Sequence, residues 1–99
     1  MKVKELLTGP EKWTQNAWGR NIAGQDLFSL GKQPLFVVSD PSVVCWCLIG
    51  AVMRCYPRCH RIPLDKICKK LKTVAVTEWN DAPERTFEDV RKLVEELDI

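Results

Sequence analysis

The sequence predicts an α+β fold for residues 1–99: a small, mainly helical single domain with a buried central helix and a short β-hairpin. Three observations lead to this prediction. The stretch from Val43 to Met53 is apolar on nearly every face of a helix, as in a helix that other elements enclose. Two later segments, after Pro63 and after Thr86, are apolar on one helical face only. Glycines at positions 19, 24 and 31 interrupt the segment that precedes these helices, as in turns and strands. A chain of 99 residues rarely contains two cores.

In the first third of the chain, the sequence predicts only short helical turns and strands. Apolar residues between Lys2 and Leu7 are spaced as on one helical face, and Gly9-Pro10 ends that pattern. Because proline suits a first helical position, a second helical turn from Glu11 to Asn16 is an open alternative. We expect a hairpin that turns near Ala23-Gly24, followed by an irregular or extended piece from Leu35 to Val38.

The central helix is predicted from Pro41 to Cys55. Ser39 or Asp40 can cap its first amides, and Pro41 fits the first turn. Tyr56 precedes Pro57 and is therefore disfavoured in a helix. Within this helix Trp46 is expected in the core, and Gly50 would let a neighbouring backbone come close.

Two more helices are expected in the second half. One opens at Pro63 and turns its lysines away from its apolar face. Residues 73–79 fit either a short strand or a continued helix, and a turn follows in which Asn80 and Asp81 fold back onto nearby backbone amides. Thr86 then caps the last helix, with Asp89 three residues on as in a capping box.

Charge is unevenly placed along the chain although the net charge is only +2. Residues 54–77 contain seven basic groups and one acid, whereas residues 78–99 contain eight acids and three basic groups. The basic segment, with the only histidine, is a candidate binding surface for an acidic protein surface or phosphate: Arg54, Arg58, His60, Arg61, Lys66, Lys69, Lys70 and Lys72. The alternative is a solvated face that pairs with the acidic C-terminal helix. Nucleic acid is the less favoured partner, because no basic strand interleaved with aromatic residues is present.

The five cysteines are expected to be thiols, and their odd number argues against a full disulfide framework. No metal site and no cofactor is predicted. On a helix, Cys45 and Cys47 would lie about 200° apart around the axis and could not share an ion, and Cys59 and His60 are adjacent. Cys47 is only a weak candidate nucleophile, because apolar surroundings raise a thiol pKa. Free buried cysteine mostly acts as a small hydrophobe, so we expect a protein that is not an enzyme.

Three tryptophans lie beside turns and polar neighbours, where an indole N–H finds a partner. Core packing is the simpler role for each. The alternative role is to line a small-molecule or nucleotide pocket between the hairpin and the Asn80-Asp81 turn. The candidate residues of this pocket are Trp13, Trp18, Trp79, Asn80, Asp81 and Arg85.

A cytoplasmic location without membrane contact is predicted. The first ten residues lack the apolar stretch of a signal peptide. The longest apolar run, from Val43 to Met53, is far short of the roughly 20 residues that cross a bilayer.

Three blocks of the sequence carry a resemblance: WTQNAWGRN, SVVCWCLIGAV and WNDAPERTFEDVRKLVEEL. The chain resembles a family of small uncharacterised proteins from bacteria, especially actinobacteria, and their phages. The matching motif residues are Trp13, Thr14 and Gln15; Trp46, Cys47, Gly50 and Ala51; and Asn80, Asp81, Pro83, Arg85 and Thr86. The other four cysteines and the basic excess lie outside that pattern.

The resemblance implies a phage or mobile-element origin. Small phage proteins without catalytic signatures often inhibit or modulate one host protein, including components of defence systems. By that analogy we expect a non-enzymatic binding protein in the host cytoplasm, which contacts a host protein through the basic segment or the acidic C-terminal helix. The first alternative is a small-molecule or nucleotide binder, and the second is a cysteine-dependent enzyme.

Overall fold

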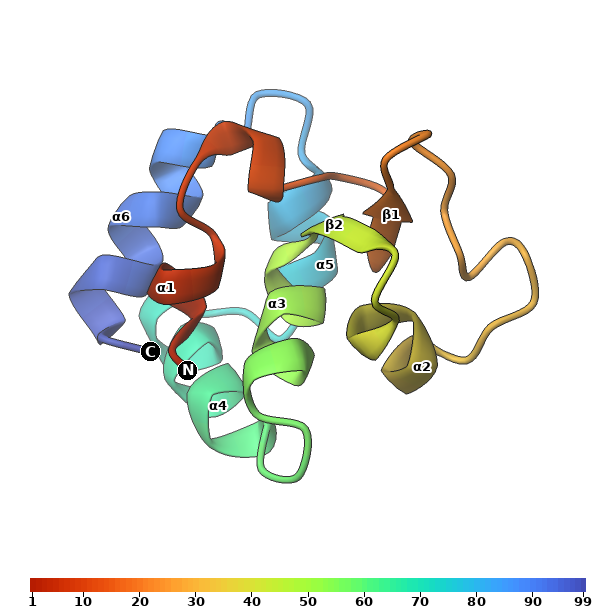
Figure 1. The fold of residues 1–99 in the computed structure, drawn as a ribbon. Helices are drawn as coiled ribbons and strands as arrows, with labels where there is room; N and C mark the ends of the chain where they lie inside the picture. The colour runs from red at the N-terminus through yellow and green to blue at the C-terminus, as the bar shows by residue number, and fades with distance from the viewer.

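The structure, a computed structural model, describes all residues from Met1 to Ile99. The predicted α+β class is confirmed, because the chain forms mostly helices and one two-stranded antiparallel sheet (Figure 1). The elements, in chain order, are α1 (Val3–Leu6), the 3-10 turn η1 (Pro10–Lys12), β1 (Gly19–Asn21), α2 (Pro34–Ser39), β2 (Val43–Trp46), α3 (Leu48–Cys55), α4 (Arg61–Leu71), α5 (Val76–Asp81) and α6 (Phe87–Leu97). None of the helices is long and apolar enough to span a membrane.

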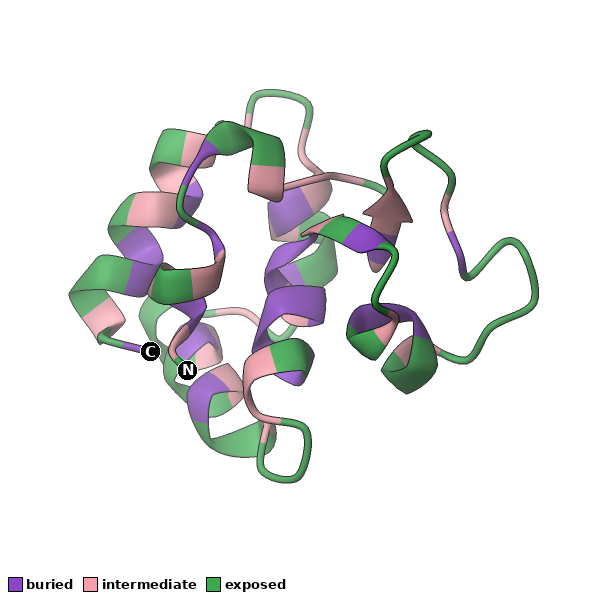
Figure 2. Ribbon diagram, in the orientation of Figure 1, coloured by how far each residue is buried: buried purple, intermediate pink, exposed green.

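Helix α3 occupies the centre of the fold. It packs against α1, α2, α4, α5 and β2, and its Leu48, Ala51 and Val52 are fully buried. The predicted buried central helix is therefore present. Figure 2 shows the buried residues on the faces of α3, α4 and α6 that turn inward. The two termini lie side by side, where the Val3 amide donates a hydrogen bond of 2.7 Å to the carbonyl of Ile99.

The predicted helix from Pro41 to Cys55 is wrong in its first half. Residues Val43–Trp46 form β2, which pairs with β1, and the helix begins only at Leu48. β-Branched and aromatic residues suit a strand, and an apolar run of this length fits either element until its pairing partner is known. The expected cap also differs: Asp40 Oδ1 accepts from the Ser42 amide at 2.8 Å and closes a turn before β2.

The predicted hairpin is correct in its turn but not in its main pairing. The Gly24 amide donates to the Asn21 carbonyl at 2.9 Å, and φ of Gly24 is +79°, which glycine adopts readily. A single bridge joins Arg20 to Asp26, but the ladder partner of β1 is β2.

Residues Leu35–Val38, expected to be extended, belong to α2, so that prediction is wrong. Pro34 takes the first helical position, and Val37 and Val38 face the core. Near the N-terminus, the predicted turn between Lys2 and Leu7 is α1, and the second helical turn is only the short η1.

The second half agrees better with the sequence. Helix α4 begins two residues before Pro63 and ends at Leu71, where Lys72 adopts the left-handed conformation. Residues 76–81 form a separate helix, α5, so the segment 73–79 is neither the predicted strand nor a continuation of the preceding helix. The predicted capping box is confirmed: Thr86 Oγ1 accepts from the Asp89 amide at 3.3 Å, and the Thr86 amide donates to Asp89 Oδ2 at 3.0 Å.

Candidate functional site

An apolar groove of about 680 Å³ lies between α2 and the C-terminal end of α3. We call it the α2–α3 groove, and its main lining residues are Pro34, Leu35, Phe36, Val38, Met53, Arg54, Pro57 and Arg58. Val38 and Met53 are buried, whereas Leu35 and Phe36 are 49% and 67% exposed. Helix α2 thus uses one side for the core and leaves two large apolar side chains on the other side in solvent.

Two arginines give the α2–α3 groove its charge. Arg54 lies in the last turn of α3 and Arg58 in the loop that follows. Neither side chain makes an ion pair or a side-chain hydrogen bond. The lining contains no carboxylate. The groove therefore combines apolar walls with positive charge that the protein itself does not neutralise.

The rest of the predicted basic surface is spread over α4. Lys70 pairs with Glu96 of α6, which is the one ion pair between the basic segment and the acidic helix. The other members, Arg61, Lys66, Lys69 and Lys72, are exposed and form no ion pair. The basic segment therefore forms only one ion pair with the acidic helix. Most α6 carboxylates have other partners, since Arg91 pairs with Glu88 and Glu95 within the helix.

His60 stands apart from the other predicted binding residues. It immediately precedes α4 and is half-buried. Its Nδ1 atom is buried and has no hydrogen-bond partner. The His60 side chain is therefore less exposed than the arginines and lysines of the basic segment.

A second cavity of about 320 Å³ lies between the loop around β1 and helix α5. It occupies the place where the sequence predicted a small-molecule pocket. We call it the acidic cavity, and its lining residues are Asn16, Ala17, Trp18, Asp26, Phe28, Cys47, Thr77 and Asp81. Among the six residues predicted for the pocket, only Trp18 and Asp81 line it.

Asn80, another predicted pocket residue, is a buried structural link with 1% of its surface exposed. Its Oδ1 accepts hydrogen bonds from Trp13 Nε1 at 2.7 Å and from the Leu48 amide at 3.0 Å. Its Nδ2 donates to the Thr14 carbonyl at 3.2 Å and to Asp81 Oδ1 at 2.8 Å. The side chain thus uses its full bonding capacity, and the predicted role in a local turn is wrong.

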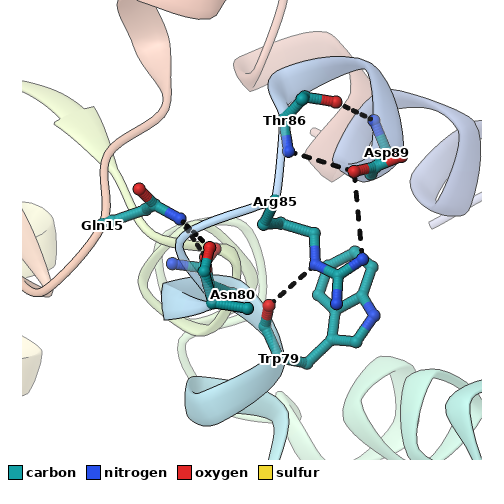
Figure 3. A network of polar contacts seen from close by, with 7 residues as sticks. Gln15, Trp79, Asn80, Arg85, Thr86 and Asp89 are labelled. Atoms are coloured by element: carbon teal, nitrogen blue, oxygen red, sulfur yellow. Dashed lines mark hydrogen bonds and ion pairs between the residues drawn. The ribbon is translucent and has the colours of Figure 1, made fainter.

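These contacts join the three blocks that carry the family resemblance. Asn80 reaches the first block through Trp13 and Thr14 and caps the central helix at Leu48. Gln15 Nε2 adds bonds of 2.9 and 2.8 Å to the carbonyls of Asn80 and Ala82 (Figure 3). The motif residues in this network hold distant parts of the fold together. This structural role accounts for them, and no bound ligand is needed to explain them.

Trp79 and Arg85, the last two predicted pocket residues, stack on each other outside both cavities. The Arg85 guanidinium lies 4.0 Å from the centroid of the Trp79 ring, and its Nε donates to the Trp79 carbonyl at 2.8 Å. Arg85 Nη1 forms an ion pair with Asp89 Oδ2 at 3.8 Å, and Figure 3 shows this contact. This cluster fastens the end of α5 to the start of α6.

The thiol of Cys47 is the N-cap of α3. Its Sγ accepts a hydrogen bond from the Gly50 amide at 3.2 Å. Burial raises its pKa to about 11, so the nucleophilic thiolate is scarce at neutral pH. Gly50 is needed beside it, because a Cβ there would come within 2.3 Å of the Trp18 carbonyl oxygen.

The remaining cysteines do not converge on a metal. The chain contains no group of three or more histidine, cysteine or carboxylate side chains close enough to hold an ion. The helical geometry used to separate Cys45 from Cys47 was wrong, since Cys45 lies in β2. Cys59 is exposed, and burial raises the pKa of the half-buried Cys55 thiol.

The arginines of the α2–α3 groove were predicted from the sequence, but the groove itself was not. The missing half was α2, which was expected to be extended. A usable signal was present, since Pro34 favours a helix start and four apolar residues follow it.

Comparison with known proteins adds one finding. The model of a family of unknown function, DUF6197, matches residues 2–97. No curated protein and no solved structure matches the chain.

Proposed function

We propose that this chain, which belongs to the DUF6197 family of unknown function, is a non-enzymatic binding protein that docks an acidic segment of a partner protein in the α2–α3 groove. The observation that carries the proposal is an open apolar groove bordered by two unpaired arginines. The rest of the basic segment, on α4, would extend the favourable field beyond the groove.

The apolar part of the groove supplies the reason for docking. Leu35 and Phe36 lie next to each other on α2 with about half or more of their surfaces in solvent. Exposed apolar patches beside a concave surface are typical of interaction sites. Burying a phenylalanine or leucine side chain contributes about 1.5–3 kcal/mol each, so a partner that covers both side chains gains considerable free energy.

The two arginines of the groove favour acidic partners over neutral ones. A neutral peptide would cover Arg54 and Arg58 and leave their guanidinium groups without compensation. A segment with an aspartate or glutamate next to its apolar anchor would pair with them, and arginine accepts a carboxylate with two parallel hydrogen bonds. Complementary charge also raises the association rate. An amphipathic helix with acidic residues flanking its apolar face meets both requirements.

The nature of the partner rests on the resemblance to phage proteins. It suggests that the bound segment belongs to a host protein in the cytoplasm, which the chain inhibits or modulates, and components of defence systems are one class of such targets. Nucleic acid suits the α2–α3 groove poorly, because Phe36 is the only aromatic residue in its lining and only two of the groove residues are cationic.

The test is selection of ligands from a displayed library of random peptides on the immobilised protein. We expect the enriched peptides to combine an apolar anchor with aspartate or glutamate. A synthetic peptide of the enriched sequence should then bind less tightly to Phe36→Ala by about 1–2 kcal/mol, or roughly 5–30-fold. Ile22→Ala is the matched control, since Ile22 is 91% exposed and does not line the groove.

The electrostatic part is tested with two charge-reversed variants of equal net charge. Arg54→Glu with Arg58→Glu should abolish most peptide binding, whereas Lys66→Glu with Lys69→Glu, on α4, should weaken it only modestly through the long-range field. The proposal fails if the enriched peptides carry no acidic residues, or if both double variants lose the same affinity.

A further inference from the structure

We propose that the acidic cavity binds a small organic cation, with an ammonium group held between Asp26 and Asp81 and against the rings of Trp18 and Phe28. This site is separate from the α2–α3 groove and does not depend on the function proposed for that groove. It replaces the nucleotide pocket that the sequence suggested at the same place.

The lining of the acidic cavity has the composition that a cation requires. It brings together two carboxylates and two aromatic rings, and it contains no lysine, arginine or histidine. Ring faces attract ammonium groups, and quaternary ammonium ions are recognised by aromatic side chains in this way. A nucleotide would instead place its phosphates beside two carboxylates, with no cation in the lining to offset the repulsion.

Both carboxylates are oriented, and each keeps one oxygen without a hydrogen bond to the protein. Asp81 Oδ1 accepts from the Asn16 amide at 2.9 Å and from Asn80 Nδ2 at 2.8 Å. Asp26 Oδ1 accepts from the Phe28 amide at 2.9 Å. Neither residue takes part in an ion pair, so no side chain of the protein already supplies the positive charge.

Arg20, the only cationic side chain between Thr14 and Leu30, does not fill this role. Its guanidinium donates to three neutral oxygens: Thr14 Oγ1 at 3.0 Å, the Gly24 carbonyl at 3.0 Å and the Gln15 carbonyl at 3.2 Å. Arg20 is thereby held outside the lining of the acidic cavity.

Cys47, which also lines the acidic cavity, adds no charge to it. Burial raises the pKa of the Cys47 thiol to about 11, with a smaller contribution from the charge of Asp81, so the sulfur carries no charge at neutral pH. Its bond to the Gly50 amide fixes it in place. The negative charge that faces a ligand therefore comes from the two aspartates.

The test compares choline with its uncharged carbon isostere, in which a tert-butyl group replaces the trimethylammonium group. We expect choline to shift the NMR signals of the Trp18 indole N–H and the Phe28 amide in a saturable way. The isostere, which has the same shape, should bind about tenfold more weakly or not measurably. ATP should not bind at this site.

Asp81→Asn keeps an oxygen for the bonds to Asn16 and Asn80, so it removes charge with little change in shape. It should weaken choline binding about fivefold or more. Asp65→Asn is the control, because Asp65 is exposed on α4 and lies outside the cavity. Equal binding of choline and its isostere, tighter binding of ATP, or no effect of choline on the two signals would overturn the proposal.

Discussion

Asn80→Ala provides the strongest test of the scaffold. The substitution removes the acceptor for the Trp13 indole N–H and the Leu48 amide and the donor for the Thr14 carbonyl. A buried polar group that loses its partner costs about 1–3 kcal/mol. The Leu48 residue is fully buried, whereas Trp13 and Thr14 are half-buried and can recover part of the loss with water. We therefore expect a loss of about 3–5 kcal/mol in unfolding free energy.

That loss is a large part of the roughly 5–15 kcal/mol that stabilises a typical domain. It is measured by urea unfolding at 25 °C, followed by tryptophan fluorescence, with the slope of the denaturant dependence compared between variants. Gln33→Ala is the matched control, because it removes an exposed amide side chain that makes no hydrogen bond, and it should change stability by less than about 0.5 kcal/mol. A loss below about 1 kcal/mol for Asn80→Ala would refute the assignment of Asn80 as the central link.

Three further predictions concern packing, thiol reactivity and pH. Gly50→Ala should destabilise the protein by about 1–3 kcal/mol in the same urea assay, because its Cβ would collide with the Trp18 carbonyl; unchanged stability would contradict that contact. Iodoacetamide at pH 8, with the products located by mass spectrometry, should modify exposed Cys59 well before Cys47, whose thiol has a pKa of about 11; the reverse order would contradict the burial of Cys47. Two lysines hold the pKa of Asp98 at about 2, below its ordinary value near 4. Its stabilising effect should be fully present above that ordinary value and be lost as the pH falls through about 2, so Asp98→Asn should be less stable than the wild type at pH 7, and the difference should shrink below the ordinary value and vanish below pH 2.

Local signals in the sequence were reliable where an element is fixed by its own residues. Thr86 and Asp89 form a capping box within one helical turn, and the structure has that box. The turn near Gly24 also follows from a few adjacent residues. In both cases the bonding partners lie within four positions along the chain, so the sequence contains the whole interaction.

Interactions between distant segments could not be predicted. Residues 43–46 are apolar enough for a buried helix or a strand, and the choice depends on pairing with residues 19–21. The role of Asn80 depends on partners 32 to 67 positions away. Nothing near Asn80 in the sequence distinguishes a buried link between blocks from a local turn.

The candidate sites could be predicted only in part, because they too combine segments that lie far apart in the sequence. The charge of Arg54 and Arg58 is visible in the sequence, but the apolar wall beside them comes from α2, about twenty positions earlier. Trp18 and Asp81 of the acidic cavity were among the predicted pocket residues, but Asp26 was not, because it reaches the cavity only through the path of the loop after β1.

A charge-swap experiment tests the central functional claim most directly. The peptide enriched on the wild-type protein and a second peptide, with its aspartates and glutamates replaced by lysine, are each titrated against the wild type and against Arg54→Glu with Arg58→Glu. If the α2–α3 groove docks an acidic segment, the wild type should prefer the acidic peptide and the variant should prefer the basic one, with both preferences shrinking at high salt. An acidic peptide that binds both proteins equally well would contradict the account.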